Sequence, residues 1–207
     1  MDKQETGRLE AFSDGVFAVA ITLLALNIKI PGLDASPAKL YGDTELWEQL
    51  RDQWPTLVAY VISFATIGVM WLNHHRLFKQ IQRTDTVLLV LNLLLLMVIV
   101  FIPVPTALLS EYLPRPDLHA AAILYCFTYF VMACLYNVLW RYAAYENRLL
   151  DEKADKKAVQ AISNQYLFGP LLYFVIVVFA IFNVPLSIAA SGSLVLFFVF
   201  PGKQPRV

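Results

Sequence analysis

Two short stretches of this sequence hold the side chains that could transfer protons or bind an ion. The first contains Arg8, Ser13 and Asp14, and the second is Trp71-Leu72-Asn73-His74-His75-Arg76. A carboxylate and an imidazole together can serve as acid and base, and His and Asp are also metal ligands. The chemistry open to these two stretches is therefore catalysis, metal binding, proton transfer or a purely structural polar contact.

The small number of acidic residues favours the structural interpretation. Asp14 is the one acid that we assign to this cluster, with no neighbouring cysteine or second carboxylate. A carboxylate at the edge of an apolar segment needs hydrogen-bond donors, which Arg8, Trp71, Asn73 or His74 can supply. We interpret the cluster as a lock that holds two helices in register. A pH-sensitive element using His74 or His75 is the main alternative.

The composition is that of a membrane protein. Of 207 residues, 58% are hydrophobic and 15% are charged, whereas soluble domains have about a quarter charged residues. The formal net charge is zero, so nothing favours nucleic-acid binding. The first apolar run lacks a basic leader and a small-residue cleavage site, so we do not expect it to be a cleaved signal.

Six apolar segments predict an all-α membrane protein that forms one domain over residues 1–207. A bilayer core of roughly 30 Å needs about 20 apolar helical residues. The segments that reach or approach this length are 12–30, 54–75, 86–110, 118–140, 164–182 and 184–200. The short connection Asn183-Val184-Pro185 predicts that the last two form a tight antiparallel hairpin, and the prolines at 103, 105 and 170 predict kinks or broken helices.

The distribution of basic residues predicts that both termini are cytoplasmic. With the N-terminus inside, the cytoplasmic side holds 12 of the 16 lysines and arginines, which agrees with the positive-inside rule. They are Lys3, Arg8, Arg76, Lys79, Arg83, Arg141, Arg148, Lys153, Lys156, Lys157, Lys203 and Arg206. We therefore expect a multi-pass protein of the cell membrane, in contact with the lipid bilayer.

The first apolar segment has a stripe of residues at helical spacing. At 100° per residue, one narrow face of the helix holds Gly15, Val19, Thr22, Leu26 and Ile30. Beside it lie the small residues Ala18 and Ala25, which permit close helix contact. Such a stripe indicates either packing inside the subunit or a surface shared between subunits.

Three strings of residues resemble a known family. The first is Arg8 followed by Phe12-Ser13-Asp14-Gly15 and FAVAITLLALNI, the second is WLNHHRLF from Trp71 to Phe78, and the third is NLLLLMVIVFIPVPTALL from Asn92 to Leu109. Together with the six expected spans, they are similar to the transmembrane protein 175 family, the lysosomal potassium channel of animals and its bacterial relatives. The resemblance covers most of the chain.

This resemblance implies a homotetramer in which each subunit gives its first helix to a central pore. The family lacks the usual potassium-channel filter, and the filter-like Thr66-Ile67-Gly68-Val69-Met70 lacks a second glycine and a re-entrant loop, so we discard it. The positions that would line the narrow part of the pore are Val19, Thr22 and Leu26, with a potassium ion transiently at Thr22. Val19 is smaller than the Ile or Leu usual at its position.

The sequence thus predicts a potassium-selective leak-type channel, with apolar gates at Val19 and Leu26 and Thr22 hydroxyls between them. Its expected partners are potassium ions, lipid and further copies of the chain. We expect no cofactor and no enzymatic activity. The alternative is a proton-coupled secondary transporter that uses Asp14 and His74 as a proton relay.

Overall fold

The computed structural model of the chain describes residues 3–32, 40–115, 117–151 and 156–199. The regular elements of this described part are all helices, and one isolated antiparallel bridge joins Ile81 and Leu150. The helices are α1 (Lys3–Leu24), α2 (Asp43–Asp52), α3 (Trp54–Phe78), α4 (Thr86–Phe101), α5 (Pro103–Tyr112), α6 (Ala120–Ala144), α7 (Lys156–Phe182) and α8 (Val184–Val199). Short 3₁₀ turns at Ala25–Asn27 and Tyr145–Asn147 follow α1 and α6.

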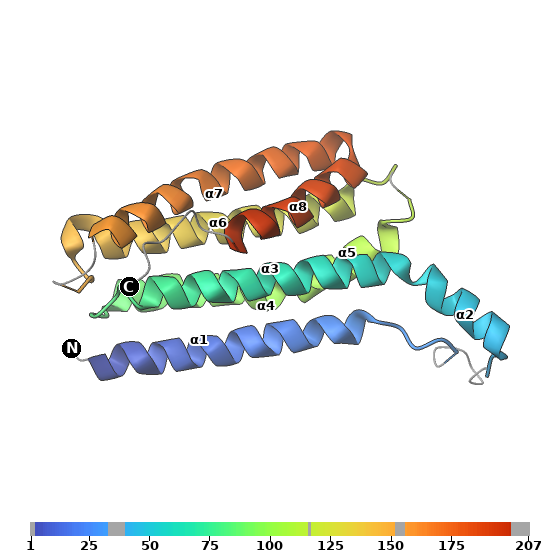
Figure 1. Cartoon of the computed structure of the whole chain (residues 1–207), viewed down its shortest axis with the longest axis horizontal. Coiled ribbons are helices and arrows are strands. Elements are labelled where there is room, and N and C mark those ends of the chain that lie inside the picture. The colour runs from blue at the N-terminus through green and yellow to red at the C-terminus, as the bar shows by residue number, and fades with distance from the viewer. Residues whose placement is uncertain (1–2, 33–39, 116, 152–155, 200–207) are drawn as a thin grey trace.

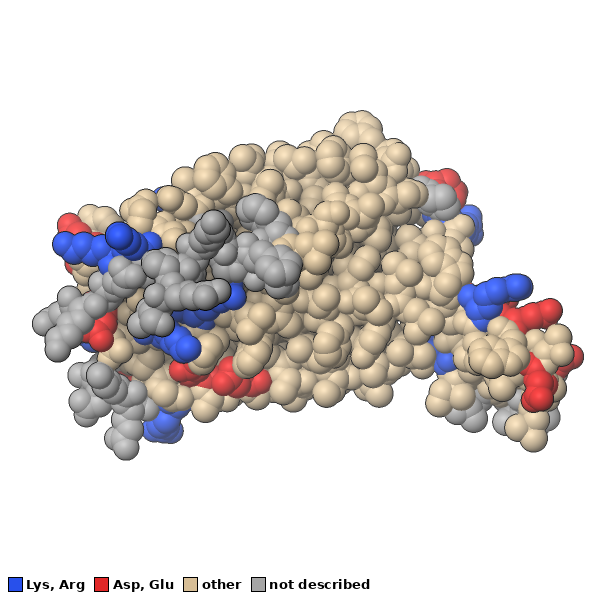
Figure 2. Space-filling model, viewed as in Figure 1, with Lys and Arg blue, Asp and Glu red and all other residues tan. Residues whose placement is uncertain are grey.

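Five helical stretches in the described residues are long and apolar enough to cross a membrane. They are Glu5–Asn27, Trp54–Phe78, Thr86–Tyr112, Ala120–Asn147 and Val159–Phe182. The apolar helix Val184–Leu196 is shorter than these. Space-filling Figure 2 shows charged residues gathered at the two ends of the molecule, with a largely uncharged middle, as expected for a protein that spans a bilayer.

The long helices form a bundle in which α1 lies at one side (Figure 1). It packs against α3, α4 and α5, while α6, α7 and α8 pack together on the opposite side of α3 and α4. We call the end of the bundle at which α1 begins the N-terminal end, and the opposite end the far end. The amphipathic helix α2 projects from the far end, and none of its residues is buried.

Several helix boundaries differ from those expected. The first helix begins at Lys3 instead of residue 12 and the fifth segment at Lys156 instead of 164. Residues 3–11 and 156–163 contain no proline to interrupt a helix. The third segment is interrupted at Ile102, between α4 and α5. Pro103 and Pro105 lack backbone N–H groups, so the regular hydrogen bonds to residues 99 and 101 cannot form there. Residue 200, the expected end of the last segment, lies outside the described residues.

By contrast, α7 continues through Pro170. This proline removes the helical hydrogen bond to the carbonyl of Tyr166, and the Asn137 Nδ2 of α6 donates to that carbonyl instead. Beyond α7 the chain turns at Asn183, whose side chain caps α8 by accepting a bond from the Leu186 N–H at 2.9 Å. The expected α7–α8 hairpin is confirmed.

Asp85 fastens the start of α4 to α6 at the N-terminal end. Its carboxylate caps α4 by accepting a bond from the Leu88 N–H at 2.9 Å. It also accepts a bond from the Tyr142 hydroxyl at 2.6 Å and lies 3.5 Å from the Arg148 guanidinium. Partial burial alone would raise the pKa of Asp85, but these three partners together lower it below its usual value.

Candidate functional site

The helix α1 has one face buried in its own subunit and one face exposed. Phe17, Ala20 and Leu24 are buried against the rest of the bundle, each at most 1% exposed. On the opposite side Val19 is 52% exposed, Leu26 is 78% exposed, and Thr22 is exposed as well. Val19 and Thr22 of the predicted stripe therefore lie on the face of α1 that the subunit itself leaves uncovered, and Leu26 is exposed in the 3₁₀ turn that follows.

Thr22 presents oxygen lone pairs on this exposed face. Its hydroxyl donates a hydrogen bond to the Val19 carbonyl at 2.9 Å, within the same helix. Because the single hydroxyl proton is donated inside α1, the lone pairs of the Thr22 oxygen are left as acceptors. An oxygen atom with free lone pairs is the group that replaces the water around a cation.

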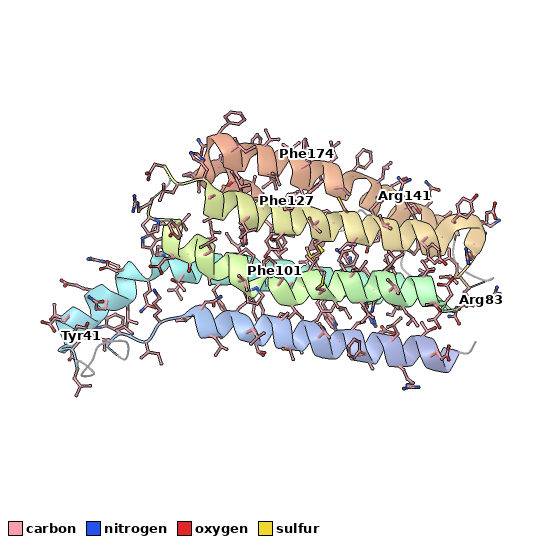
Figure 3. The ribbon with its side chains drawn as sticks, turned by 180° about the vertical axis from the view of Figure 1, so that it is seen from behind. Tyr41, Arg83, Phe101, Phe127, Arg141 and Phe174 are labelled. Atoms are coloured by element: carbon pink, nitrogen blue, oxygen red, sulfur yellow. The ribbon has the colours of Figure 1, made fainter. Side chains whose placement is uncertain are left out.

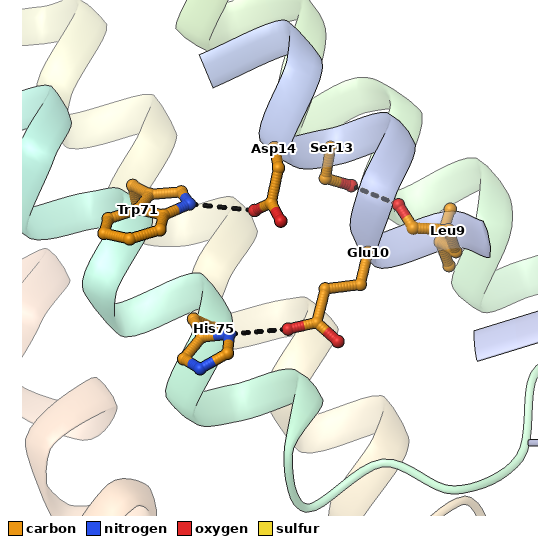
Figure 4. A network of polar contacts seen from close by, with 6 residues as sticks. All are labelled: Leu9, Glu10, Ser13, Asp14, Trp71 and His75. Atoms are coloured by element: carbon orange, nitrogen blue, oxygen red, sulfur yellow. Dashed lines mark hydrogen bonds and ion pairs between the residues drawn. The ribbon is translucent and has the colours of Figure 1, made fainter. Parts of the chain in front are cut away.

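Two polar bonds attach the first half of α1 to α3 (Figure 4). The Trp71 indole Nε1–H donates to the Asp14 carboxylate at 2.8 Å, and one turn nearer the N-terminus the His75 Nδ1 lies 2.6 Å from the Glu10 carboxylate. The two bonds are parallel because Glu10 and Asp14, like Trp71 and His75, are four residues apart on a helix. Glu10 corrects the expectation of a single acid here.

A second group of polar residues lies behind these bonds, in the interior. The Ser13 hydroxyl donates to the Leu9 carbonyl at 2.8 Å, so the Asn92 Nδ2–H donates to the Ser13 oxygen at 3.0 Å. The Asn92 Oδ1 then accepts from the His74 Nε2 at 3.0 Å. Ser13, His74 and Asn92 are all 0% exposed, so this chain joins α1, α4 and α3 through three fully buried side chains.

The direction of these bonds sets the protonation of His74. Since Asn92 uses its oxygen toward His74, the Nε2 atom carries the proton. The Nδ1 atom is buried without a hydrogen-bond partner in the described part of the chain. The ring itself packs edge-on to Phe17 and stacks on Phe78. His74 is therefore held by ring packing and by the bond to Asn92.

Three residues that the sequence assigned to the cluster lie elsewhere. Arg8 and Phe12 are exposed, and the described residues offer Arg8 no hydrogen bond or ion pair, since the helix turns both side chains away from α3. Asn73 is buried on the other face of α3, where Arg76 donates to its Oδ1 at 3.4 Å. Its carbonyl accepts from the Tyr166 hydroxyl at 3.3 Å. Of the donors expected for Asp14, Trp71 is the one that bonds to it, and no hydrogen bond from Arg8, Asn73 or His74 reaches its carboxylate in the described residues.

At the far end, α1 is attached to the kinked third span. The Asn27 Nδ2 donates to the carbonyl of Pro103 at 3.1 Å, and Lys29 forms an ion pair with Glu111 at 2.8 Å. Sequence reasoning missed these contacts together with Glu10 and Asn92. Asn92 carried a signal, because it is a single amide within the apolar stretch Thr86–Phe101, and a lone polar residue in a membrane helix usually meets another.

The described residues contain no group of three or more His, Cys, Asp or Glu side chains placed to hold a metal ion. The two cysteines, Cys126 and Cys134, are not joined in a disulfide. The hydrogen bonds described above connect α1 to α3 and α4.

Comparison with known proteins gives consistent matches over nearly the whole chain. A family model described as the endosomal/lysosomal potassium channel TMEM175 matches residues 8–103. A protein of Chamaesiphon minutus named a potassium channel is 46% identical, with 95% of each chain covered. Another of that name from Streptomyces collinus is 44% identical, over 95% of this chain and 92% of the relative.

A solved structure extends the match to three dimensions. The crystal structure of a lysosomal potassium-selective channel TMEM175 homologue from Chamaesiphon minutus aligns with a TM-score of 0.83 at 42% identity, covering 95% of this chain and 97% of the other. Sequence and fold agree over almost the full length. The resemblance seen in the sequence is thereby confirmed, and the chain belongs to the TMEM175 family.

Proposed function

We propose that this protein is a potassium channel in which four copies of the chain place their α1 helices around a central pore. Membership of a family of ion channels supports the activity and makes the protein a channel instead of an enzyme. The observation that carries the arrangement is the exposed face of α1. A helix that buries Phe17 and Leu24 while leaving Val19, Thr22 and Leu26 uncovered has its second face available for other copies.

In the proposed pore, Val19 and Leu26 form two apolar rings with a ring of Thr22 hydroxyls between them. An apolar constriction gates by losing its water, and hydroxyl oxygens replace part of the hydration shell of a passing cation. At 1.5 Å per residue, Val19 and Leu26 are about 10 Å apart along the helix. This length fits one partly dehydrated potassium ion held transiently at Thr22.

The polar bonds of α1 have a structural role in this proposal. Asp14 and Glu10 hold the first half of the helix on α3, and Asn27 holds its last turn on the third span. They keep Val19, Thr22 and Leu26 turned toward the shared axis. The lock is thus the function that we assign to Ser13, Asp14, Trp71 and His74.

We further infer six membrane spans with the N-terminal end of the bundle in the cytoplasm of a cell-membrane protein. Basic residues support this orientation, because Arg76 and Arg141 lie in the last turns of α3 and α6, and Arg83 lies between α3 and α4. Figure 3 shows Arg83 and Arg141 at the N-terminal end. The sixth span is α8, which is shorter than the others and pairs with α7.

Ion flux into liposomes tests the activity. Purified protein in vesicles loaded with potassium should conduct potassium passively. The flux should need no proton gradient, and its rate should not saturate at low potassium concentration. A proton-coupled transporter would instead show flux that stops when the proton gradient is abolished. Nothing in the geometry favours that alternative, because no hydrogen bond joins Asp14 to His74 in the described residues.

Particle images of the purified protein would count the copies around the axis, and any number other than four rejects the tetramer.

A further inference from the structure

A groove between α6 and α7 lies at the N-terminal end, on the side of the bundle away from α1. Its volume is about 380 Å³, and its lining comes from the last two turns of α6 and the third and fourth turns of α7. The lining residues are Asn137, Trp140, Arg141, Ala144, Tyr145, Ser163, Asn164 and Leu167. None of these residues is acidic, and Arg141 gives the groove a positive charge.

Arg141 differs from the arginines near it. Arg148 is paired with Asp85, and Arg76 donates to Asn73. Arg141 is exposed, and no ion pair or hydrogen bond of its side chain occurs within the residues that the structure describes. An unpaired guanidinium beside a cavity is suited to bind an anion, and its fork of N–H groups matches the oxygens of a phosphate.

Two further hydrogen-bond donors line the same groove. Gln160 donates to the Asn164 Oδ1 at 3.0 Å, which leaves the Asn164 Nδ2 atom as a donor. The side chain of Tyr145 is 67% exposed, so its hydroxyl is accessible. Trp140, whose Nε1–H is occupied by the Ser163 oxygen at 2.9 Å, forms a buried wall. The donors surround an opening large enough for a phosphate group.

An apolar stripe continues from the groove along α7 toward the middle of the bundle. Leu167, Leu171 and Phe174 are spaced by four and three residues, so they lie on one face of the helix. They are 49%, 58% and 51% exposed, respectively. Arg141 and Phe174 both lie on the α6–α7 side of the bundle (Figure 3). A ligand that fits both parts has a phosphate head and an acyl chain.

We propose that this groove is a binding site for one anionic phospholipid, with its phosphate on Arg141, Asn164 and Tyr145 and an acyl chain along Leu167, Leu171 and Phe174. The position of the groove, where apolar helix gives way to charged loops, is the depth of lipid headgroups. The site is separate from the pore face of α1, so it stands whether or not the channel proposal holds.

Native mass spectrometry of the purified protein tests this site with two lipids that share acyl chains, phosphatidylglycerol and phosphatidylcholine. The wild-type protein should bind one phosphatidylglycerol per subunit more tightly than phosphatidylcholine. Arg141→Gln should weaken phosphatidylglycerol binding about fivefold, which is the contribution of one arginine near an anionic surface. Asn164→Ala, at an exposed position, should weaken it as well.

Matched variants separate a built site from general attraction to basic residues. Arg115→Gln removes an exposed arginine at the far end and should leave phosphatidylglycerol binding unchanged. Ala144→Phe keeps every charge but fills the groove, so it should also weaken binding. Equal losses in Arg141→Gln and Arg115→Gln, or no loss in Ala144→Phe, would overturn the proposal.

Inorganic phosphate serves as a competitor that lacks an acyl chain. Retention of phosphatidylglycerol in excess phosphate supports a lipid site, whereas displacement means that the groove binds a free anion and the proposal is wrong. A change in subunit number in Ala144→Phe without any change in bound lipid would show that another copy covers the groove, which also overturns it.

Discussion

The indole N–H of Trp71 donates to the carboxylate of Asp14 at 2.8 Å, which fixes the rotation and height of α1 on α3. This bond places Asp14 directly against the last two turns of α3. Every residue proposed for the pore lies within twelve residues of Asp14, so we expect the position of the proposed pore face to depend on this contact.

Replacement of Trp71 by phenylalanine should therefore loosen α1 without creating a large cavity. We expect the free energy of unfolding to fall by about 1 kcal/mol, since hydrogen bonds between membrane helices contribute about this much. Thermal unfolding followed by size exclusion in detergent measures the change. Trp54→Phe is the control, because Trp54 is half exposed and should tolerate the same replacement; equal losses in both variants would argue against the lock.

Ser13→Ala should cost more than its size suggests. The Ser13 oxygen accepts the Asn92 amide N–H in a fully buried place, so the variant leaves that donor without an acceptor. The expected loss is about 1–3 kcal/mol in the free energy of unfolding. Ser110→Ala removes a hydroxyl that bonds only to its own helix at Ala107 and should change stability little. The thermal assay used for Trp71 compares the two.

The stability provided by Asp85 should depend on pH. Because the pKa of this carboxyl is lowered in the folded protein, its contribution is present above the unfolded value of 3.8 and is lost as the pH falls through the lower folded value. Asp85→Asn keeps a side-chain oxygen that can cap α4 but loses the charge opposite Arg148. We expect it to lower the melting temperature near neutral pH, with the difference from wild type shrinking below pH 3.8. A constant difference across the titration would contradict this.

Thr22→Ala should reduce discrimination between potassium and sodium in liposome flux by several-fold. The variant removes the oxygen that faces away from the subunit while leaving the helix intact, because within the described residues the Thr22 hydroxyl bonds to the Val19 carbonyl of its own helix. Thr128→Ala is the matched control, since that hydroxyl also bonds within its own helix, to Leu124. An unchanged permeability ratio in Thr22→Ala would exclude Thr22 from the selective part of the pore.

Val19→Asn should raise the resting leak of potassium, because an amide wets a constriction that an isopropyl group keeps dry. Flux from vesicles in the absence of any stimulus measures the leak. Val61→Asn makes the same change at a valine of α3 that is 60% exposed and should leave the leak unaltered. Equal leaks in wild type and Val19→Asn would remove Val19 as a gate.

The sequence predicted the helices well and their polar partners less well. Apolar length predicts the long apolar helices, and the turn at Asn183 predicts the α7–α8 hairpin, because these signals are local along the chain. The partners of Asp14 are not local. Antiparallel packing brought the right segment of α3 to α1, but the rotation of α3 turns Trp71 and His75 toward α1 and Asn73 away from it. That rotation results from packing of the whole bundle.

The effect of each proline on its helix also could not be predicted from the local sequence. Pro103 and Pro170 carry the same signal in the sequence, yet the third span is interrupted and α7 is continuous. The difference comes from Asn137 on another helix, which donates to the carbonyl that Pro170 leaves free. Only the folded chain shows whether such a neighbour is present.

The bond from Asn27 to Pro103 has a mechanical consequence. It couples the last turn of α1 to the residue at which the third span bends, while Asp14 and Glu10 restrain the opposite half of the same helix. Because both ends of α1 are restrained, the helix resists rotation about its long axis. A swing of α5 about Ile102 would instead pull on one end of α1, so we expect the proposed pore to widen by bending of α1.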